Sequence, residues 1–286
     1  MRVIRLASVG VTVPAPLDTA RFFSEMLDFA VVEHDTGIDI TARGEYSHDA
    51  PGRMLTLIKG PELGLAALRF DCAALEPLRV RLHDRAIAFT EVAASREAEA
   101  GLGFVDPAGV AIACTTGSAP LGSALPPSDV RPRRIGHINI AVGNAAAEAA
   151  FYADVLGLRL SEQIGESFFF LRVGSEHHNI GFRANAERTT VHHVGFEIAG
   201  WESFRVICDR IAERGHTVEY GPGRHGPGNN LFVYLVDPSS GLRLELFADM
   251  ARIDDEAGYR AKRWESVDRV KTVNRWGPQP PESFLR

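Results

Sequence analysis

The stretches Gly136-His-Ile-Asn-Ile-Ala-Val142 and Phe151-Tyr-Ala-Asp-Val-Leu-Gly-Leu158, eight residues apart, decide the fold because both have counterparts near the N-terminus. Ala7-Ser-Val-Gly-Val-Thr-Val13 is likewise followed, after eight residues, by Phe22-Phe-Ser-Glu-Met-Leu-Asp-Phe29. In each copy, apolar residues first alternate and then recur every three or four positions, which predicts a strand followed by a helix. The chain therefore contains an internal repeat.

The two copies also end alike. Asp106-Pro107 in the first copy and Asp237-Pro238 in the second precede a glycine, which is the composition of a turn between two strands of a hairpin. Further alternating segments lie between, with one more helix expected over residues 75–86 and 201–214. We expect an α+β protein with two tandem modules, each built from paired βαβββ units that form a partly open barrel.

The expected boundaries follow from composition. Residues 1–118 form the N-terminal module, and residues 119–133 belong to a linker rich in proline, serine and glycine. Residues 134–250 form the C-terminal module. Residues 251–286 are an extension, expected to close over the active site as a lid, with a helix over residues 254–265.

Composition narrows the class of protein. The net charge is −6 and the chain has no basic run, so we expect no nucleic-acid partner. No apolar stretch reaches the length of a membrane span, so no membrane partner is expected either. The three cysteines are widely spaced and lie in apolar segments, as is typical of reduced thiols. We therefore expect a cytoplasmic protein, and a homo-oligomer as the usual assembly of such enzymes.

The two copies differ in their potential metal ligands. Two imidazoles and a carboxylate in the second copy stand where the first has side chains that cannot bind metal: His137 aligns with Ser8, His193 with about Leu65, and Glu245 with Ala113. Each lies on a predicted strand. Two histidines and one carboxylate leave three adjacent octahedral positions open, the arrangement used by Fe(II) that must hold substrate and dioxygen together. We therefore predict a mononuclear site in the second module.

The segment from Gly223 to Glu245 carries a family resemblance. Its Gly223-Arg-His225, the apolar residue and tyrosine at Tyr234, Asp-Pro, glycine and final glutamate resemble the signature of the type I extradiol ring-cleavage dioxygenases, in the vicinal oxygen chelate (glyoxalase/bleomycin resistance/dioxygenase) superfamily. The likeness is to members of the catechol 2,3-dioxygenase and homoprotocatechuate 2,3-dioxygenase types and covers nearly the whole chain. One departure is that two residues, Ser239 and Ser240, separate Pro238 from the glycine, where the family has one. A β-bulge can absorb the extra residue. The exact placement of Glu245 depends on how this extra residue is absorbed.

The resemblance implies a role for each site residue. His137, His193 and Glu245 would bind Fe(II), with Mn(II) as the alternative because it uses the same ligands. Catalytic roles would fall to three further residues: His225 and Tyr234 would hydrogen-bond the phenolic oxygens, and His178 would contact dioxygen and pass on a proton, as an imidazole with an ordinary pKa can. Asn139 and Phe170 would contact the substrate. The first members of the two His-His pairs, His177 and His192, are expected to point to the opposite face.

The activity implied is extradiol (meta) cleavage of a catechol by dioxygen, giving a muconic semialdehyde-type product. Thr272 and Val273 stand where homoprotocatechuate enzymes carry paired arginines, so we expect a neutral catechol, although Arg269, Lys271 or Arg275 could substitute. Two alternatives stay open because the superfamily hosts several activities. One is a metal-dependent glyoxalase- or isomerase-like enzyme, and the other is a non-catalytic protein that binds an aromatic ligand.

Overall fold

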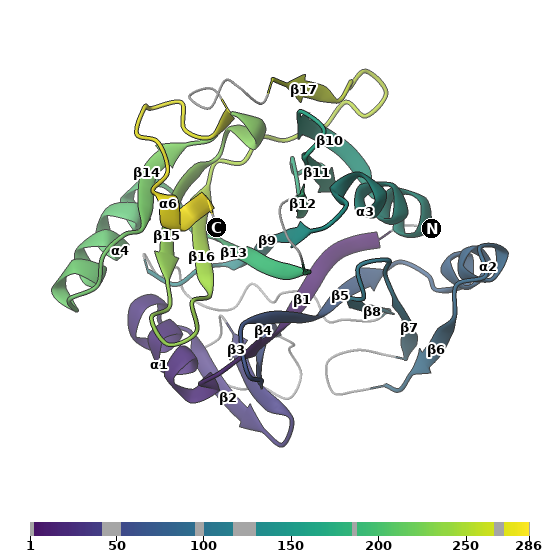
Figure 1. Ribbon diagram of the computed structural model, residues 1–286, viewed down its shortest axis with the longest axis horizontal. Coiled ribbons are helices and arrows are strands. Elements are labelled where there is room, and N and C mark those ends of the chain that lie inside the picture. Colours follow the sequence, from purple (N-terminus) through teal and green to yellow (C-terminus); the bar gives the residue numbers. More distant parts are fainter. Residues whose placement is uncertain are drawn as a thin grey trace.

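The chain forms two mixed β-sheets, one for each copy of the repeat. A computed structural model describes residues 3–41, 53–94, 100–116, 130–184, 188–265 and 272–285. Figure 1 shows the first sheet in purple and blue and the second in teal, green and yellow, with β1 and β9 between them near the middle of the molecule. Within the described residues, no helix is both long and apolar enough to cross a membrane.

The first sheet contains eight strands in the order β2-β3-β4-β1-β5-β8-β7-β6. Two βαβββ units supply it, and each begins with one of the central antiparallel strands, β1 and β5. In chain order the elements are β1 (Val3–Val13), α1 (Pro16–Leu27), β2 (Ala30–His34), β3 (Gly37–Thr41), β4 (Arg53–Lys59), β5 (Gly64–Cys72), α2 (Glu76–Asp84), β6 (Phe89–Val92), β7 (Gly101–Val105) and β8 (Ala111–Thr115).

The second sheet repeats this plan, with strand order β14-β15-β16-β13-β9-β12-β11-β10-β17. The helix of its first unit ends in a π-helical turn, Tyr152–Leu156. The elements are β9 (Arg134–Val142), α3 (Ala145–Phe151), β10 (Arg159–Ile164), β11 (Phe168–Arg172), β12 (Ile180–Ala184), β13 (Thr190–Glu197), α4 (Trp201–Glu213), β14 (Tyr220–Arg224), β15 (Leu231–Val236), β16 (Arg243–Ala248), β17 (Lys262–Trp264) and α6 (Glu282–Leu285).

The expected fold class is therefore confirmed: the protein is α+β, and each sheet consists of paired βαβββ units. The helices expected over residues 75–86 and 201–214 form as α2 and α4. The helix expected over residues 254–265 is wrong, because this segment instead ends in strand β17, which pairs in parallel with β10. The boundaries at residues 118, 133 and 250 stay predictions, and residues 117–129 of the expected linker lie outside the described residues.

The modules meet through two related contacts. Thr19 on α1 donates a hydrogen bond to Asp237 in the turn between β15 and β16, at 2.7 Å. Tyr152, in the π-helical turn after α3, donates one to Asp106 in the corresponding turn between β7 and β8, at 2.9 Å. Phe196 of β13 packs edge-on against the ring of Phe29, so an apolar contact accompanies the polar pair. These contacts hold the modules together around their central strands.

Candidate metal centre

Three central strands of the second sheet bring the predicted ligands together. In the antiparallel pair of β9 and β13, His137 lies opposite Gly195, and His193 lies opposite Asn139. In the parallel pair of β13 and β16, Gly195 lies opposite Glu245. The two registers therefore place His137 and Glu245 on either side of one glycine, with His193 two residues away on the same strand and face.

The side chains converge as this register requires. One ligand atom from each of His137, His193 and Glu245 lies within 4.8 Å of the other two. His137 Nε2 is 2.9 Å from Glu245 Oε2, and His193 Nε2 is 3.1 Å from the same oxygen. All three residues are buried, and no other group of His, Cys, Asp and Glu among the described residues is arranged this closely.

The corresponding positions of the first sheet carry no such ligands. Ser8 lies opposite Arg69, and Arg69 lies opposite Ala113. By this register Ser8 corresponds to His137 and Ala113 corresponds to Glu245, as expected. The alignment of His193 with Leu65 is wrong by two residues: Gly10, the counterpart of Asn139, lies opposite Ala67. The conclusion is unchanged, because alanine binds no metal either.

Gly195 is a functional position that sequence reasoning missed. A Cβ atom at this residue would lie 2.2–2.5 Å from three atoms of the His137 ring, far inside van der Waals contact. Only glycine leaves room for the imidazole to reach Glu245. The repeat could have revealed this position, because the residue of the first sheet that corresponds to Gly195 is Arg69. Of these central positions, this one shows the largest difference in side-chain size between the two copies.

Hydrogen bonds hold the Glu245 carboxylate from two sides. Tyr234 donates to Oε2 at 2.8 Å, and Asn230 donates to Oε1 at 2.8 Å. Burial by itself raises the pKa of Glu245, but the imidazoles beside it, His137 above all, hold this pKa well below its ordinary value. Glu245 is therefore an anion, oriented by partners that leave it facing the two imidazoles. Asn230 was not predicted, although it lies within the quoted motif.

His225 and Tyr234 lie together beside the ligands, as predicted. His225 Nε2 is 3.0 Å from the Tyr234 hydroxyl and 3.6 Å from Glu245 Oε1. Burial, and then the charge of Glu245, raise the pKa of Tyr234 well above its ordinary value, so its hydroxyl keeps its proton. His225 Nδ1 donates to the Val273 carbonyl at 2.6 Å. In a neutral ring this leaves Nε2 with a lone pair, so the single proton of the Tyr234 hydroxyl can be donated either to Glu245 Oε2 or to His225 Nε2.

His178 also faces the site, with its ring 4.6 Å from that of His137 and 5.1 Å from that of Phe170. Its expected ordinary pKa is wrong: burial, followed by the neighbouring His137 and His177, lowers the pKa of His178 well below the usual value. His178 is therefore a neutral imidazole. Its proton-transfer role stays a prediction.

His177 and His192 do not point to the opposite face. His177 Nδ1 lies 3.0 Å from His178 Nδ1, and His192 Nδ1 lies 2.8 Å from His193 Nδ1. The physical reasons differ. His192 is the extra residue of a bulge in β13, where the register shifts between Val191 and His193. His177 precedes the first residue of β12, so the alternation of a strand does not apply to it.

A cavity of about 420 Å³ opens onto two of the three proposed ligands, His193 and Glu245. Asn139, His178, His225 and Tyr234 lie on its wall beside the metal ligands, and Phe170 stacks on Phe168 to form an apolar side. The predicted substrate contacts are thus in place around one cavity, although the role of each stays a prediction. Arg183 also lies on this wall and donates to the Leu285 carbonyl at 2.7 Å. This cation was not predicted.

The C-terminal extension forms part of the same wall through Thr272, Val273, Pro280 and residues of α6. Thr272 is buried. Arg275 donates to Asn229 at 2.8 Å and is not part of the wall. Arg269 and Lys271 lie outside the described residues. The extension therefore lines the cavity, and its closing over the site as a lid stays a prediction.

The extra residue after Pro238 does not disturb Glu245. Asp237 accepts hydrogen bonds from the backbone and hydroxyl of Ser239 and from the backbone of Ser240 within the turn. Strands β15 and β16 then pair without a register shift, and Tyr234 lies opposite Glu245. The insertion is absorbed in the turn rather than as a bulge in the strand.

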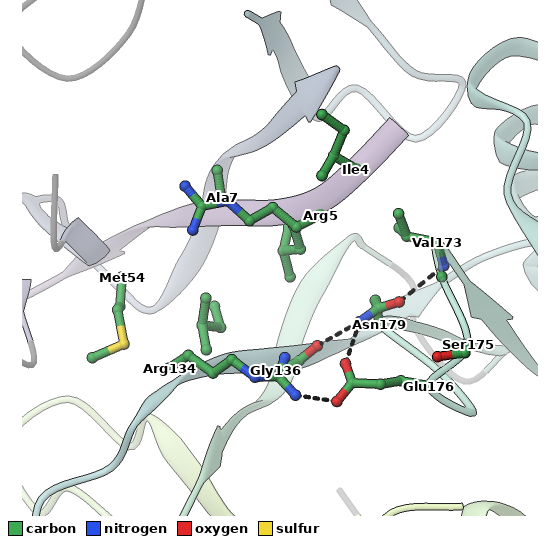
Figure 2. A pocket seen from close by; sticks show the side chains of 13 residues that line it. Ile4, Arg5, Ala7, Met54, Arg134, Gly136, Val173, Ser175, Glu176 and Asn179 are labelled. Atoms are coloured by element: carbon green, nitrogen blue, oxygen red, sulfur yellow. Dashed lines mark hydrogen bonds and ion pairs between the residues drawn. The ribbon is translucent and has the colours of Figure 1, made fainter. Parts of the chain in front are cut away.

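A smaller cavity of about 200 Å³ lies between β1 and β9 (Figure 2). Arg134 contacts Glu176 within the cavity and Glu197 outside it, and Arg5 pairs with Asp71 outside it. Asn179 donates to Glu176 and to the Gly136 carbonyl. Figure 2 shows the contacts that join Arg134, Glu176, Asn179 and Gly136. These contacts anchor the β9 backbone next to His137, which is a structural role.

Two imidazoles and a carboxylate in a buried site are a donor set that fits a divalent transition metal. The pKa of His193 is lowered to about 4, by burial first, so its ring is neutral as a ligand must be. Buried His137 Nδ1 has no hydrogen-bond partner in the described part of the chain, so the ring is positioned by the contact of its Nε2 with Glu245 and by packing against Phe247 and His178. The residues present therefore fit a bound metal ion.

Comparison with known proteins adds to this geometry. Residues 134–246 match the model of the Glyoxalase/Bleomycin resistance protein/Dioxygenase superfamily. Metapyrocatechase 2 of Cupriavidus necator is 31% identical over 159 residues, 55% of this chain and 48% of that protein. The manganese-dependent 2,3-dihydroxybiphenyl 1,2-dioxygenase of Geobacillus genomosp. 3 is 28% identical over 162 residues, 54% of this chain and 51% of that protein. The chain thus spans about half the length of these curated relatives.

Solved structures share the fold over nearly the whole chain. The Mn(II)-bound glyoxalase from Novosphingobium aromaticivorans has a TM-score of 0.85 at 21% identity, covering 99% of this chain and 94% of that one. Homoprotocatechuate 2,3-dioxygenase from Arthrobacter globiformis has a TM-score of 0.84 at 20% identity, covering 100% and 91%. At this identity the likeness establishes the fold alone.

Proposed function

Residues 134–246 form a domain of the glyoxalase/bleomycin resistance protein/dioxygenase superfamily, and from this premise we propose that the chain cleaves a catechol ring with dioxygen next to the diol. The product would be a muconic semialdehyde-type compound that contains both oxygen atoms. One observation carries the proposal: a complete ligand triad lies in a single module, and two of its members, His193 and Glu245, line one cavity with His178, His225 and Tyr234. The similarity to metapyrocatechases supports it.

We assign the metal as Fe(II), held by His137, His193 and Glu245, with Mn(II) as the alternative. When bound, the ion supplies Lewis acidity that lowers the pKa of a catechol hydroxyl, and it holds the diol beside dioxygen. Four oxygen- or nitrogen-bearing groups of the chain then act on the substrate directly: Asn139, His178, His225 and Tyr234.

His225 is the residue best placed to take a proton from a catechol hydroxyl. Its Nδ1 proton is committed to the Val273 carbonyl, so its Nε2 accepts. Tyr234 keeps its own proton because the pKa of this buried tyrosine is raised, and its hydroxyl turns from Glu245 to donate a hydrogen bond to the phenolate that results. His178, neutral and packed against Phe170, contributes a hydrogen bond on the dioxygen side.

The cavity favours a flat, largely apolar substrate. Phe168, Phe170 and Ile164 offer ring and aliphatic surface, and a catechol that carries a neutral alkyl or aryl group would pack there. We therefore keep a neutral catechol as the proposed substrate. The buried thiols of Cys72 and Cys114 agree with a reducing, cytoplasmic setting. A homo-oligomer remains the proposed assembly.

Oxygen uptake tests the proposal. The protein is loaded anaerobically with Fe(II) and mixed with air-saturated catechol, 3-methylcatechol, 2,3-dihydroxybiphenyl or protocatechuate in an oxygen electrode. We expect uptake of one dioxygen per catechol, a yellow product, and a preference for the neutral substrates over protocatechuate. His193→Ala should lose both metal and uptake, whereas His83→Ala should keep both, because His83 is exposed and lies outside the cavity.

Other outcomes separate the alternatives. Bound metal without oxygen uptake for any catechol would contradict the dioxygenase and leave a glyoxalase- or isomerase-like enzyme, which isomerises its substrate without consuming oxygen. Tight binding of catechols by metal-free protein, with neither uptake nor isomerisation, would leave a ligand-binding protein.

A further inference from the structure

His192 connects a metal ligand to the C-terminal helix. Its Nε2 lies 2.9 Å from the main-chain carbonyl oxygen of Phe284 on α6, and its Nδ1 lies 2.8 Å from Nδ1 of His193. The side chain is buried and packs edge-on against the Phe284 ring. The bulge in β13 is what turns His192 toward its neighbour, since a regular strand would point the two side chains apart.

The positions of the protons follow from these partners. A carbonyl oxygen carries no hydrogen, so His192 Nε2 must be the N–H that donates to Phe284. A neutral imidazole has one N–H only, so His192 Nδ1 holds a lone pair and accepts the N–H of His193 Nδ1. His193 Nε2 is then left with its own lone pair, and this is the atom that lies 3.1 Å from Glu245 Oε2.

Arg243 holds the backbone on both sides of this contact. It donates to the main-chain oxygen of His192 at 3.2 Å and to that of Ser283, the residue before Phe284, at 2.9 Å. Glu219 in turn holds the Arg243 guanidinium through two hydrogen bonds. A third side chain therefore connects the strand that carries His192 to the helix that carries its acceptor.

We propose that His192 is a positioning residue: held by the Phe284 carbonyl, it fixes His193 as the Nδ1–H tautomer, the form that can bind metal through Nε2. The inference rests on the metal centre of the proposed function. Without His192, His193 can move its proton to Nε2 and donate to Glu245, an arrangement that satisfies both side chains and excludes the ion. Outer partners of this kind commonly fix the tautomer of a metal-binding histidine.

The second imidazole ligand gives the contrast. Within the described residues, His137 Nδ1 is buried without a hydrogen-bond partner, so no acceptor fixes its tautomer in this way. His193 is therefore the ligand whose Nε2 already carries a lone pair, ready for coordination, in the metal-free protein. It is also the ligand that the C-terminal extension can influence, because the acceptor that orients His192 belongs to α6.

Two substitutions of His192 separate tautomer control from packing. His192→Phe keeps a buried aromatic ring but offers no acceptor to His193. His192→Asn is smaller, yet its side-chain oxygen can occupy the place of Nδ1 and accept the same N–H. The full-length chain is titrated with Co(II) and followed by visible absorption. We expect His192→Phe to weaken Co(II) binding about 10–100-fold, in the range of other outer partners, and His192→Asn to recover most of this loss.

A second readout needs neither affinity nor activity. In the full-length chain loaded with diamagnetic Zn(II), imidazole nitrogen NMR shifts should show His193 with its proton on Nδ1 and His192 with its proton on Nε2. Circular dichroism confirms that each variant is folded. A proton on Nε2 of His193, or metal bound through its Nδ1, would overturn the inference.

The remaining outcomes distinguish this inference from the proposed function. Equal Co(II) affinity in wild type and His192→Phe, with lowered thermal stability in both variants, would show a packing role only and overturn it. A wild-type chain that binds no Co(II) would overturn the metal centre together with it. Weakened binding in His192→Phe, combined with no oxygen uptake for any catechol in wild type, would support this inference while contradicting the dioxygenase.

Discussion

Gly195 separates His137 from Glu245 across the three central strands, and the space it leaves is filled by the His137 ring. The proposed metal site therefore requires a residue without a Cβ atom at position 195 as well as its three proposed ligands. At the corresponding central positions, the first sheet has Arg69 in place of Gly195. It also lacks the two histidines and the glutamate of the second sheet. Both changes prevent metal binding there.

Gly195→Ala should therefore damage the site without touching a ligand. The new Cβ would force the His137 ring away from Glu245, and we expect weaker Co(II) binding together with a loss of about 1–3 kcal/mol in the free energy of unfolding from overpacking. Co(II) titration and urea unfolding measure the two effects. Gly174→Ala is the matched control, because a Cβ at Gly174 meets nothing within 4 Å. Wild-type Co(II) affinity in Gly195→Ala would refute this reading.

At the residue scale, the clustering of the three proposed ligands could be predicted from the sequence, and their surroundings could not. Comparison of the two copies of the repeat identified His137, His193 and Glu245, because the first copy lacks such residues at the matching positions. The orientation of His192 depends on a bulge, and a bulge leaves no mark in the alternation of side chains. Asn230 reaches Glu245 from the short helical turn before β15, where strand periodicity carries no information.

At the scale of elements, the hairpin turns were predictable and the C-terminal extension was not. The Asp-Pro pair followed by serines and a glycine indicated the β15–β16 turn. Asp237 accepts hydrogen bonds from Ser239 and Ser240 within this turn. Residues 254–265 have helical composition, but Asp255 accepts the backbone N–H of Gly258 in a local turn that competes with a helix. The segment then reaches the free edge of β10 and pairs with it as β17.

The C-terminal extension also contacts the first histidine of each His-His pair, His177 and His192. The Ala251 carbonyl accepts the backbone N–H of His177, and the Phe284 carbonyl accepts from the ring of His192. Between them, the Trp264 indole donates to Glu162, whose carboxylate lies 3.5 Å from His177 Nε2. One C-terminal segment therefore supports both sides of the site through groups that do not themselves touch the metal ligands.

At the scale of the molecule, the contacts between the modules are related by the repeat but differ in charge. Thr19 on α1 faces Asp237, whereas its counterpart Glu148 on α3 faces Asp106. Glu148 is 4% exposed, and its Oε2 has no hydrogen-bond partner among the described residues. Burial, and then the charge of Asp106, raise the pKa of Glu148 to about 7.

This raised pKa makes the stability of the protein depend on pH. The folded state holds the Glu148 proton more tightly than the unfolded state, so the stability that it contributes is complete below about pH 4.5 and is lost as pH rises through about 7. Glu148→Gln keeps the shape without the charge. We expect this variant to be more stable than wild type at pH 8, by on the order of 2 kcal/mol, and similar to it at pH 5.

Urea unfolding at the two pH values measures the difference. Glu213→Gln, which removes an exposed carboxylate on α4, controls for the change in net charge. If Glu148→Gln and wild type lost stability equally between pH 5 and pH 8, Glu148 would not be the group that titrates between the modules.

The position of the metal itself tests the account most directly. Crystals of the full-length chain loaded with Fe(II) or Mn(II) would give an anomalous difference map at the absorption edge of the metal. We predict one strong peak per chain, bounded by His137, His193 and Glu245, and its loss in a Glu245→Gln variant. A peak among Ser8, Ala67 and Ala113 of the first sheet, or well-ordered ligands with no peak at all in metal-loaded crystals, would contradict it.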